Sequence, residues 1–248
     1  MKKIALITGS SRGIGAATAI LLAKQGYDIC INYKNNAIAA NDVLGQVKKL
    51  GAKCIAIQAD VSNEAHVLDL FEQIDQQLGP ISALVNNVGM LLPQSKLLDM
   101  NADRINKILS TNVTSYFLCC REAVKRMSTA RSGGGGAIVN VSSVAARTGS
   151  PGEYIDYAAS KGAIDTLTKG LSEEVATEGI RVNSVRPGFI KTEMHADGGE
   201  PDRIERIKDN IPMQRGGDSS EVASAIAWLL SEDASYVTGS FTDVAGGR

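Results

Sequence analysis

The sequence predicts an α/β fold, a doubly wound parallel sheet in a three-layer α/β/α domain. Short, fully apolar runs alternate with stretches of helical periodicity along the whole chain. The apolar runs lack the polar alternation of a half-exposed sheet, so we expect strands that are covered on both faces. No linker interrupts the pattern, and 248 residues suit one large domain, which we place at residues 1–248.

The elements follow in a regular order. The first two expected strands lie at residues 4–7 and 29–31, and helical spacing of apolar residues follows at 37–50. A second such stretch lies at 67–78. Further strands are expected at residues 54–57, 83–85, 137–139 and 182–185, and a flexible turn at the glycine run 133–136.

One segment breaks the rhythm. Residues 192–212 are polar, contain Gly198 and Gly199, and carry a short charged helix pattern around Ile204 and Ile207. An irregular insertion after a strand is typical of a lid over a binding site, so we expect a substrate lid there.

The composition indicates which partners the protein binds and in which cellular compartment it acts. The chain has 26 basic and 27 acidic residues, a net charge of −1, so it lacks the basic excess that nucleic-acid binding requires. No apolar run is long enough to span a membrane, and the N-terminus enters a strand-like run without a signal-peptide pattern. We therefore expect a cytoplasmic protein with neither nucleic-acid nor membrane partners.

Cysteine and histidine positions argue against a metal. Free thiols of a reducing compartment are expected, because C-x-x-C spacing is absent from the four cysteines, Cys30, Cys54, Cys119 and Cys120. His66 and His195 stand alone, so we expect no metal site.

A glycine turn follows the first strand. The sequence T-G-S-S-R-G-I-G contains Gly9, Gly13 and Gly15, and a helix pattern begins there. Backbone N–H groups and the helix dipole would converge on one point that suits a pyrophosphate. The spacing G-x-x-x-G-x-G differs from the common G-x-G-x-x-G fingerprint, but its place between strand and helix predicts dinucleotide binding.

A tyrosine–lysine pair lies in the stretch E-Y-I-D-Y-A-A-S-K. On a helix both Tyr154 and Tyr157 face Lys161, but Tyr157 is about 6 Å below it and Tyr154 about 10.5 Å. Only Tyr157 can easily place its hydroxyl beside the ammonium, whose charge is expected to lower the phenol pKa. The alternative is a helix with aromatic core residues and a solvated lysine.

The end of the second strand bears on the choice of cofactor. Asp28 has the distance from Gly9 expected of a ribose-binding acid, but it begins the strand, whereas ligands bind at carboxyl ends. Lys34 ends the strand and Arg12 lies in the glycine turn, so both can flank a 2′-phosphate. We therefore expect NADP rather than NAD.

Six motifs in order resemble the short-chain dehydrogenase/reductase family, including members that are 3-oxoacyl-carrier-protein reductases or resemble glucose dehydrogenase. After the glycine turn come N-N-V-G at residues 86–89, Asn112, V-N-V-S-S at 139–143, Y-A-A-S-K at 157–161 and R-P-G at 186–188. Val88 replaces the usual alanine, and the separation between Ser143 and Tyr157 is 14, one more than the commonest spacing, so Ser142 stays an alternative to Ser143.

The resemblance implies a Rossmann-type fold and a catalytic set. Tyr157 would be the proton donor in reduction, Lys161 would tune it and bind the nicotinamide ribose, Ser143 would hold the substrate oxygen, and Asn112 would position a relay water. Together with the glycine turn, it assigns cofactor binding to Gly9, Ser11, Arg12, Gly13, Ile14, Gly15, Tyr33, Lys34, Asp60, Val61, Asn87, Gly89, Tyr157, Lys161, Pro187, Gly188, Ile190 and Thr192.

The expected activity is NADP-dependent hydride transfer to or from a carbonyl or secondary alcohol of a small molecule, such as a sugar or polyol. One alternative is a 3-oxoacyl-carrier-protein reductase, which Glu178 disfavours because that family position is often basic in those enzymes, although Arg131 lies nearby. Another is a non-catalytic dinucleotide sensor. The resemblance also implies a homotetramer, with residues 237–244 as its last strand region.

Overall fold

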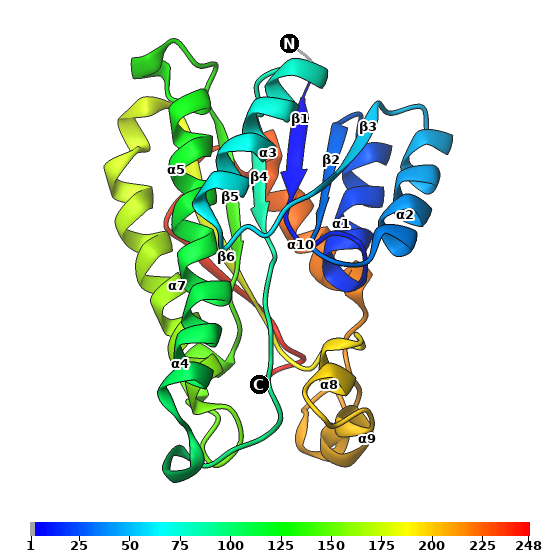
Figure 1. Ribbon diagram of the computed structural model, residues 1–248, viewed down its shortest axis with the longest axis vertical. Coiled ribbons are helices and arrows are strands. Elements are labelled where there is room, and N and C mark those ends of the chain that lie inside the picture. Colours follow the sequence, from blue (N-terminus) through cyan, green and yellow to red (C-terminus); the bar gives the residue numbers. More distant parts are fainter. Residues whose placement is uncertain (1–2) are drawn as a thin grey trace.

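The parallel sheet forms the middle layer of the molecule (Figure 1). The computed structural model describes residues 3–248, and within them seven strands pair in parallel in the order β3-β2-β1-β4-β5-β6-β7. These strands are β1 Ile4–Ile7, β2 Asp28–Tyr33, β3 Cys54–Gln58, β4 Ala83–Asn86, β5 Gly136–Val141, β6 Ile180–Pro187 and β7 Phe241–Val244. The predicted fold class is confirmed, and all six expected apolar runs are strands.

The strand order creates the site. β1 pairs with β2 on one side and with β4 on the other, so Ile7 lies between Ile31 and Val85. The connections that leave β1 and β4 therefore turn toward opposite faces of the sheet, which opens a crevice at the carboxyl ends of these two strands.

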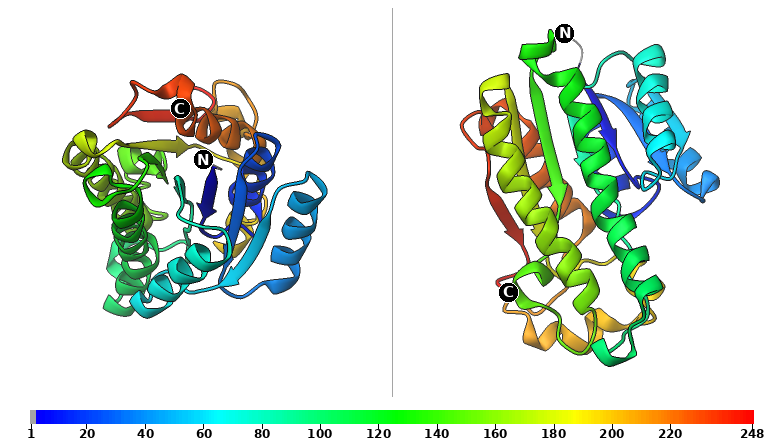
Figure 2. Two further views of the ribbon diagram at one scale, coloured as in Figure 1. Left: turned by 90° about the horizontal axis from the view of Figure 1, so that it is seen from above. Right: turned by 60° about the vertical axis from the view of Figure 1, so that its left-hand side comes forward.

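Helices cover both faces of the sheet (Figure 2). One face packs against α1 Gly13–Lys24, α2 Ala37–Lys49 and α10 Ser219–Leu230. The other packs against α3 Glu64–Gln77, α5 Ser115–Met127 and α7 Ile155–Glu174. The apolar stripes predicted at 37–50 and 67–78 supply Val43 and Phe71 to these two cores.

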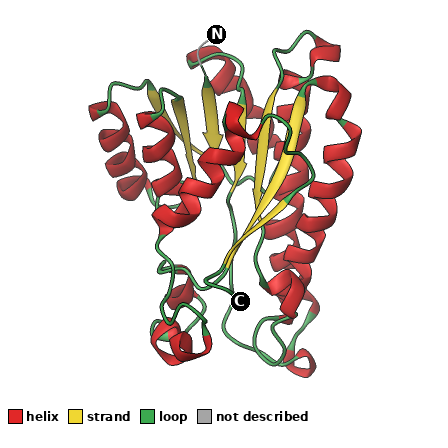
Figure 3. Cartoon of the chain, turned by 180° about the vertical axis from the view of Figure 1, so that it is seen from behind, coloured by secondary structure: helices red, strands yellow, loops and turns green. Residues whose placement is uncertain are grey.

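Two more segments extend beyond the carboxyl edge of the sheet. α4 Ala102–Leu109 runs into α5 through a π-helical turn, Ser110–Thr114. The segment predicted as a lid carries α8 Met194–Asp197 and α9 Arg203–Ile207, and the short α6 Ala145–Thr148 follows β5. Figure 3 shows that the two lid helices lie below the strand ends, away from the main helical layers.

The structure also shows the state of the four cysteines and whether any helix could span a membrane. All four cysteines are buried and free, as expected. Over residues 3–248, the helices are too short or too polar to cross a bilayer.

Glycines of the run 133–136 approach neighbouring backbone closely. A Cβ on Gly133 would lie 2.4 Å from the Arg126 carbonyl oxygen, and one on Gly136 would lie 2.6 Å from that of Ser82. The prediction of a flexible turn did not include this close backbone approach, which glycine permits.

Gly15 fixes how α1 leaves the first strand. A Cβ on it would lie 2.6 Å from Asn87 Nδ2 and 2.7 Å from Gly9 O, so no larger residue fits without moving the turn. Gly45, in the middle of α2, has nothing within 4 Å of the same position.

We expect Gly15→Ala and Gly45→Ala to change stability with opposite signs. The first overpacks the turn and should lower the free energy of unfolding by about 1–3 kcal/mol. The second should raise it by up to about 1 kcal/mol, since alanine favours helix. Urea denaturation of both variants measures this, and a neutral Gly15→Ala would contradict the packing argument.

Candidate active site

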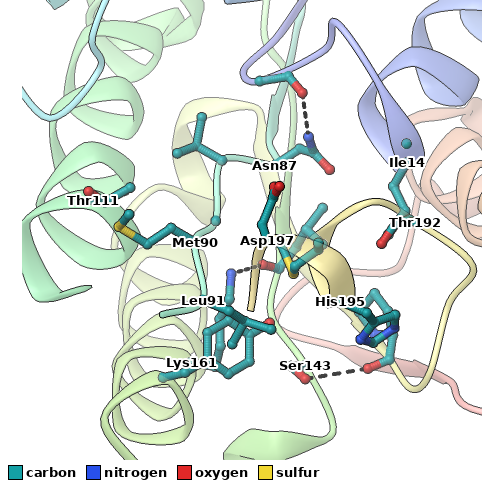
Figure 4. Close-up of a pocket in the computed structure, with 18 of the residues that line it drawn as sticks. Ile14, Asn87, Met90, Leu91, Thr111, Ser143, Lys161, Thr192, His195 and Asp197 are labelled. Atoms are coloured by element: carbon teal, nitrogen blue, oxygen red, sulfur yellow. Dashed lines mark hydrogen bonds between the residues drawn. The ribbon is translucent and has the colours of Figure 1, made fainter. Parts of the chain in front are cut away.

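A large cavity lies at the carboxyl ends of the strands. Its volume is about 1300 Å³, and the lid, the glycine turn and the start of α7 contribute to its walls. In Figure 4, Ile14 and Thr192 lie on one side of this space and Ser143 and Lys161 on another. The structure thus brings together nearly all the residues predicted for the site, and only Gly15 and Asn112 lie behind the wall.

The glycine turn forms one end of the cavity. Gly9 and Gly13 have φ values of +61° and +55°, in the left-handed region that favours glycine. No side chain caps the N-terminus of α1, so its first N–H groups are available to an anion. These features, and the room that the glycines leave, fit a dinucleotide pyrophosphate.

The turn is attached to the neighbouring strands. Asn87 Nδ2 donates to Thr8 O at 3.0 Å and to Gly9 O at 3.1 Å, and Asn32 Oδ1 accepts from Gly9 N at 3.2 Å. Val88, where the family usually has alanine, lies 3.1 Å from a Cβ built on Gly9, so it packs under the turn.

Both cations predicted to flank a 2′-phosphate are paired with carboxylates. Lys34 Nζ lies 2.6 Å from Asp60 Oδ2, and Arg12 contacts Asp197 of the lid. Burial raises the pKa of the Asp60 carboxyl, but hydrogen bonds from Lys34 and Ser62 outweigh it and lower the net pKa. A phosphate at this end would replace carboxylates that already hold these cations.

Asp28 is buried at the amino end of β2, where its carboxylate accepts a hydrogen bond from Lys53 N at 2.8 Å. It does not line the cavity, so it is not the ribose ligand of a Rossmann-type site.

The start of α7 forms the floor of the cavity. Tyr157 and Lys161 both line it, and Lys161 Nζ lies 5.7 Å from the centroid of the Tyr157 ring. Tyr154 precedes the helix, and its hydroxyl donates to Gly198 O of the lid at 3.3 Å. The spacing argument for Tyr157 agrees with this arrangement.

Burial dominates the proton affinities of this pair. It raises the pKa of Tyr157 to about 12, against the opposing effects of a hydrogen bond from Ser143 and the charge of Arg203. It lowers the pKa of Lys161 to about 7. The expectation that the lysine lowers the phenol pKa is wrong for the chain alone, because burial raises the pKa of Tyr157 and an amine with a pKa of about 7 has lost its charge before the phenol titrates.

The two candidate serines have different partners. Ser142 Oγ donates to the backbone carbonyl of Lys161 at 3.1 Å, whereas Ser143 Oγ accepts from Ala145 N at 3.1 Å and donates to Pro187 O at 3.5 Å. Of the two serines, only Ser143 lowers the pKa of the Tyr157 phenol. Ser143 is therefore the serine adjacent to the phenol.

Asn112 is fully buried in the π-helical turn. Its side chain accepts from Met90 N at 2.8 Å, donates to Met90 O at 3.1 Å, and donates to Ser160 Oγ at 3.2 Å. These bonds hold the segment after β4 against α7, so the side-chain amide does not reach the cavity.

Two further residues of the lid line the cavity but are outside the predicted catalytic and cofactor-binding set. Arg203 is 7% exposed, contacts Glu153, and lies over the rings of Tyr154 and Phe189 at 4.6 and 5.4 Å. His195 also lines the cavity, and its Nε2 bonds to Ile190 O at 3.0 Å. The only signal in the sequence was their position inside the predicted lid.

The residues predicted to lie beside the nicotinamide are at the end of β6 and in the loop that follows it. Pro187 ends β6, Gly188 N donates to Val244 O at 3.0 Å, and Thr192 lies beside Gly13. β6 and β7 therefore hold the start of a loop that reaches the glycine turn at Thr192.

Comparison with known proteins agrees with this geometry. Residues 9–248 match the family described as Enoyl-(Acyl carrier protein) reductase. The chain is 64% identical over 245 residues to the uncharacterized oxidoreductase YgfF of Escherichia coli, covering 99% of both chains. It is 36% identical over 247 residues to the 3-oxoacyl-[acyl-carrier-protein] reductase FabG of Staphylococcus aureus, covering 100% of this chain and 98% of the relative.

Solved structures show the same fold. A variant of a Serratia marcescens short-chain dehydrogenase/reductase is 33% identical and has a TM-score of 0.90, with 99% of this chain and 97% of that chain covered. A blue fluorescent protein from a metagenomic library, solved in complex with NADPH, is 34% identical, with the same TM-score and coverage. The chain is thus an NAD(P)-dependent oxidoreductase and belongs to the short-chain dehydrogenase/reductase family.

Proposed function

We propose that the protein is an NADP-dependent oxidoreductase that transfers hydride between the nicotinamide and a carbonyl or secondary alcohol of a small molecule such as a sugar or polyol. The observation that carries the proposal is the placement of Ser143, Tyr157 and Lys161 in the same cavity as the glycine turn. This cavity can hold a dinucleotide and a small substrate side by side.

The chain's own residues supply proton transfer and orientation. A bound nicotinamide supplies or accepts the hydride. Tyr157 donates the proton to the substrate oxygen in reduction and removes it in oxidation, while Ser143 hydrogen bonds to that oxygen as charge develops. Lys161 supplies a positive charge close to the phenol, and Asn112 fixes the adjoining segment.

The protonation states at neutral pH suit reduction. With its pKa raised to about 12, Tyr157 keeps its proton and is ready to donate it. Lys161, with a pKa of about 7, carries its charge below that pH and loses it above.

One wall at the substrate end of the cavity carries a network of ion pairs around Arg203. Arg206 contacts both carboxylates that Arg203 contacts, Glu153 at 3.4 Å and Glu200 at 2.8 Å. Arg203 Nε and His195 Nδ1 are buried without a hydrogen-bond partner among the described residues. Buried side-chain nitrogens without a partner support a substrate that offers polar groups to this wall.

A carrier-protein substrate remains the second candidate, because the FabG relative carries that name. Glu178, which disfavours this candidate at a family position that is often basic, lies far from the cavity of its own chain. Glu178 follows the C-terminus of α7, some 20 residues from Tyr157, which is about 30 Å along a helix. It bonds with Ser128 and does not line the cavity.

A panel of NADPH oxidation assays tests the proposal. It should contain aldoses, ketoses, small ketones and aldehydes, and 3-oxoacyl thioesters. Turnover of the sugars or small carbonyls supports the proposal, and selective turnover of thioesters replaces it with the second candidate. Tight NADPH binding without any turnover would favour the sensor.

Tyr157→Phe should lower kcat about 10²- to 10⁴-fold, because it removes the proton donor. NADPH affinity should change by less than about threefold, since only one hydroxyl is lost. Tyr154→Phe is the matched variant on the same segment, and we expect a loss of less than about tenfold. Stopped-flow and fluorescence titration measure the two quantities. Equal losses in both variants would refute the assignment.

The cofactor preference has its own test. Arg12→Ala and Lys34→Ala should each weaken NADPH binding about tenfold and leave NADH within about threefold, because each removes a charge-assisted contact to the 2′-phosphate. Lys24→Ala, at the far end of α1, is the matched control. Tighter binding of NADH than NADPH by the unmodified protein, or an unchanged Arg12→Ala, would contradict NADP.

Arg203→Met should raise KM for the small substrate about tenfold or more, because it removes a buried donor from the substrate wall. Arg206→Met removes the exposed arginine of the same ion-pair network and should change KM by less than about threefold. Steady-state kinetics at saturating NADPH separate the two. Equal effects would show that Arg203 acts only through the network.

A further inference from the structure

Tyr116 lies at the centre of the catalytic region but outside the set expected from the sequence. It is 1% exposed, on the first turn of α5. Its hydroxyl oxygen lies 3.2 Å from Lys161 Nζ, 2.9 Å from Val141 O and 3.0 Å from Val88 O. One phenol thus joins the loop after β4, the end of β5 and the lysine of α7.

The direction of these hydrogen bonds follows from the atoms involved. The phenol has one proton, and two carbonyl oxygens lie within reach of it. That proton is therefore donated to Val88 or Val141, and the hydroxyl oxygen accepts from Lys161. Burial raises the pKa of Tyr116 well above its usual value, so the phenol stays neutral.

The lysine is held from one side. A protonated amine has three N–H donors and no acceptor. Lys161 Nζ donates to Val141 O at 2.7 Å and to Tyr116 at 3.2 Å. The amine lies 5.1 Å from the centroid of the Tyr116 ring and 5.7 Å from that of Tyr157, so it sits between the two rings. The third N–H remains for the cavity side.

We propose that Tyr116 is a positioning residue that holds the Lys161 ammonium toward Tyr157 and the dinucleotide. Its role in turnover rests on the proposed function, but its effect on Lys161 does not require turnover. Tyr116 lies four residues after Asn112 along the helix, and both bond to the segment of Val88 to Met90. The same stretch of helix therefore sets the position of that segment and of the lysine.

Tyr116→Phe keeps the ring and removes only the hydroxyl. Lys161 then loses one of its two oxygen acceptors, which favours the neutral amine. We expect the pH at which NADPH affinity falls to move down by about one unit, since a hydrogen bond to a charged group is worth about that much. In the unmodified protein that fall should lie near the Lys161 pKa of about 7, with tighter binding below it.

The measurement is NADPH binding by fluorescence from pH 5.5 to 9, followed by kcat/KM for NADPH over the same range where a substrate is found. Tyr27→Phe is the control, because Tyr27 is also buried and its hydroxyl bonds to a carbonyl, Leu230 O, remote from the cavity. It should leave the profile unchanged.

The outcomes separate this proposal from the proposed function. A profile shifted in Tyr116→Phe but not in Tyr27→Phe supports the positioning role, with or without turnover. Identical profiles in Tyr116→Phe and the unmodified protein would overturn it. If Tyr116→Phe fails to fold, Tyr116→Met, which also lacks the hydroxyl, is measured in the same way. Absence of turnover on every substrate would count against the proposed function alone.

Discussion

A buried amine held by neutral oxygen atoms is the constraint on which the site depends. Lys161 is 2% exposed, and its hydrogen bonds go to the Val141 carbonyl and the Tyr116 hydroxyl. Burying a cation is costly unless its partners compensate, and neutral oxygens compensate less than a carboxylate does. The nearest acid on its own helix, Asp165, is paired with Arg186 at 2.8 Å. The lysine thus keeps a donor for the cavity that a carboxylate partner would have taken.

The sheet explains why these groups meet. Residues separated by more than 150 positions along the chain, from Gly9 to Pro187, follow the carboxyl ends of parallel strands and so reach one edge. Periodicity and turn chemistry were therefore enough to predict the strands and the glycine turn at the edge of the cavity. The rise of a helix was enough to choose Tyr157 over Tyr154, because that choice depends only on local geometry.

Other features depend on contacts between distant segments, which periodicity does not encode. Arg203 is buried among Glu153 and Tyr154 from the segment before α7 and Phe189 from the loop after β6. From the sequence, Tyr116 is indistinguishable from the other apolar residues of α5. Only the structure shows that its hydroxyl contacts Val141 and Lys161.

The same constraint determines which charges the chemistry can use. Burial separates the proton affinities of Tyr157 and Lys161, raising one and lowering the other. At neutral pH the phenol is protonated and the amine is partly charged, which is the state that begins a carbonyl reduction. Oxidation needs the phenol to lose its proton, and the positive charge that favours this must come from the lysine beside it. Any contact that keeps Lys161 protonated therefore affects both directions of the reaction. In reduction it preserves the positive charge beside the phenol, and in oxidation that charge helps the phenol to lose its proton.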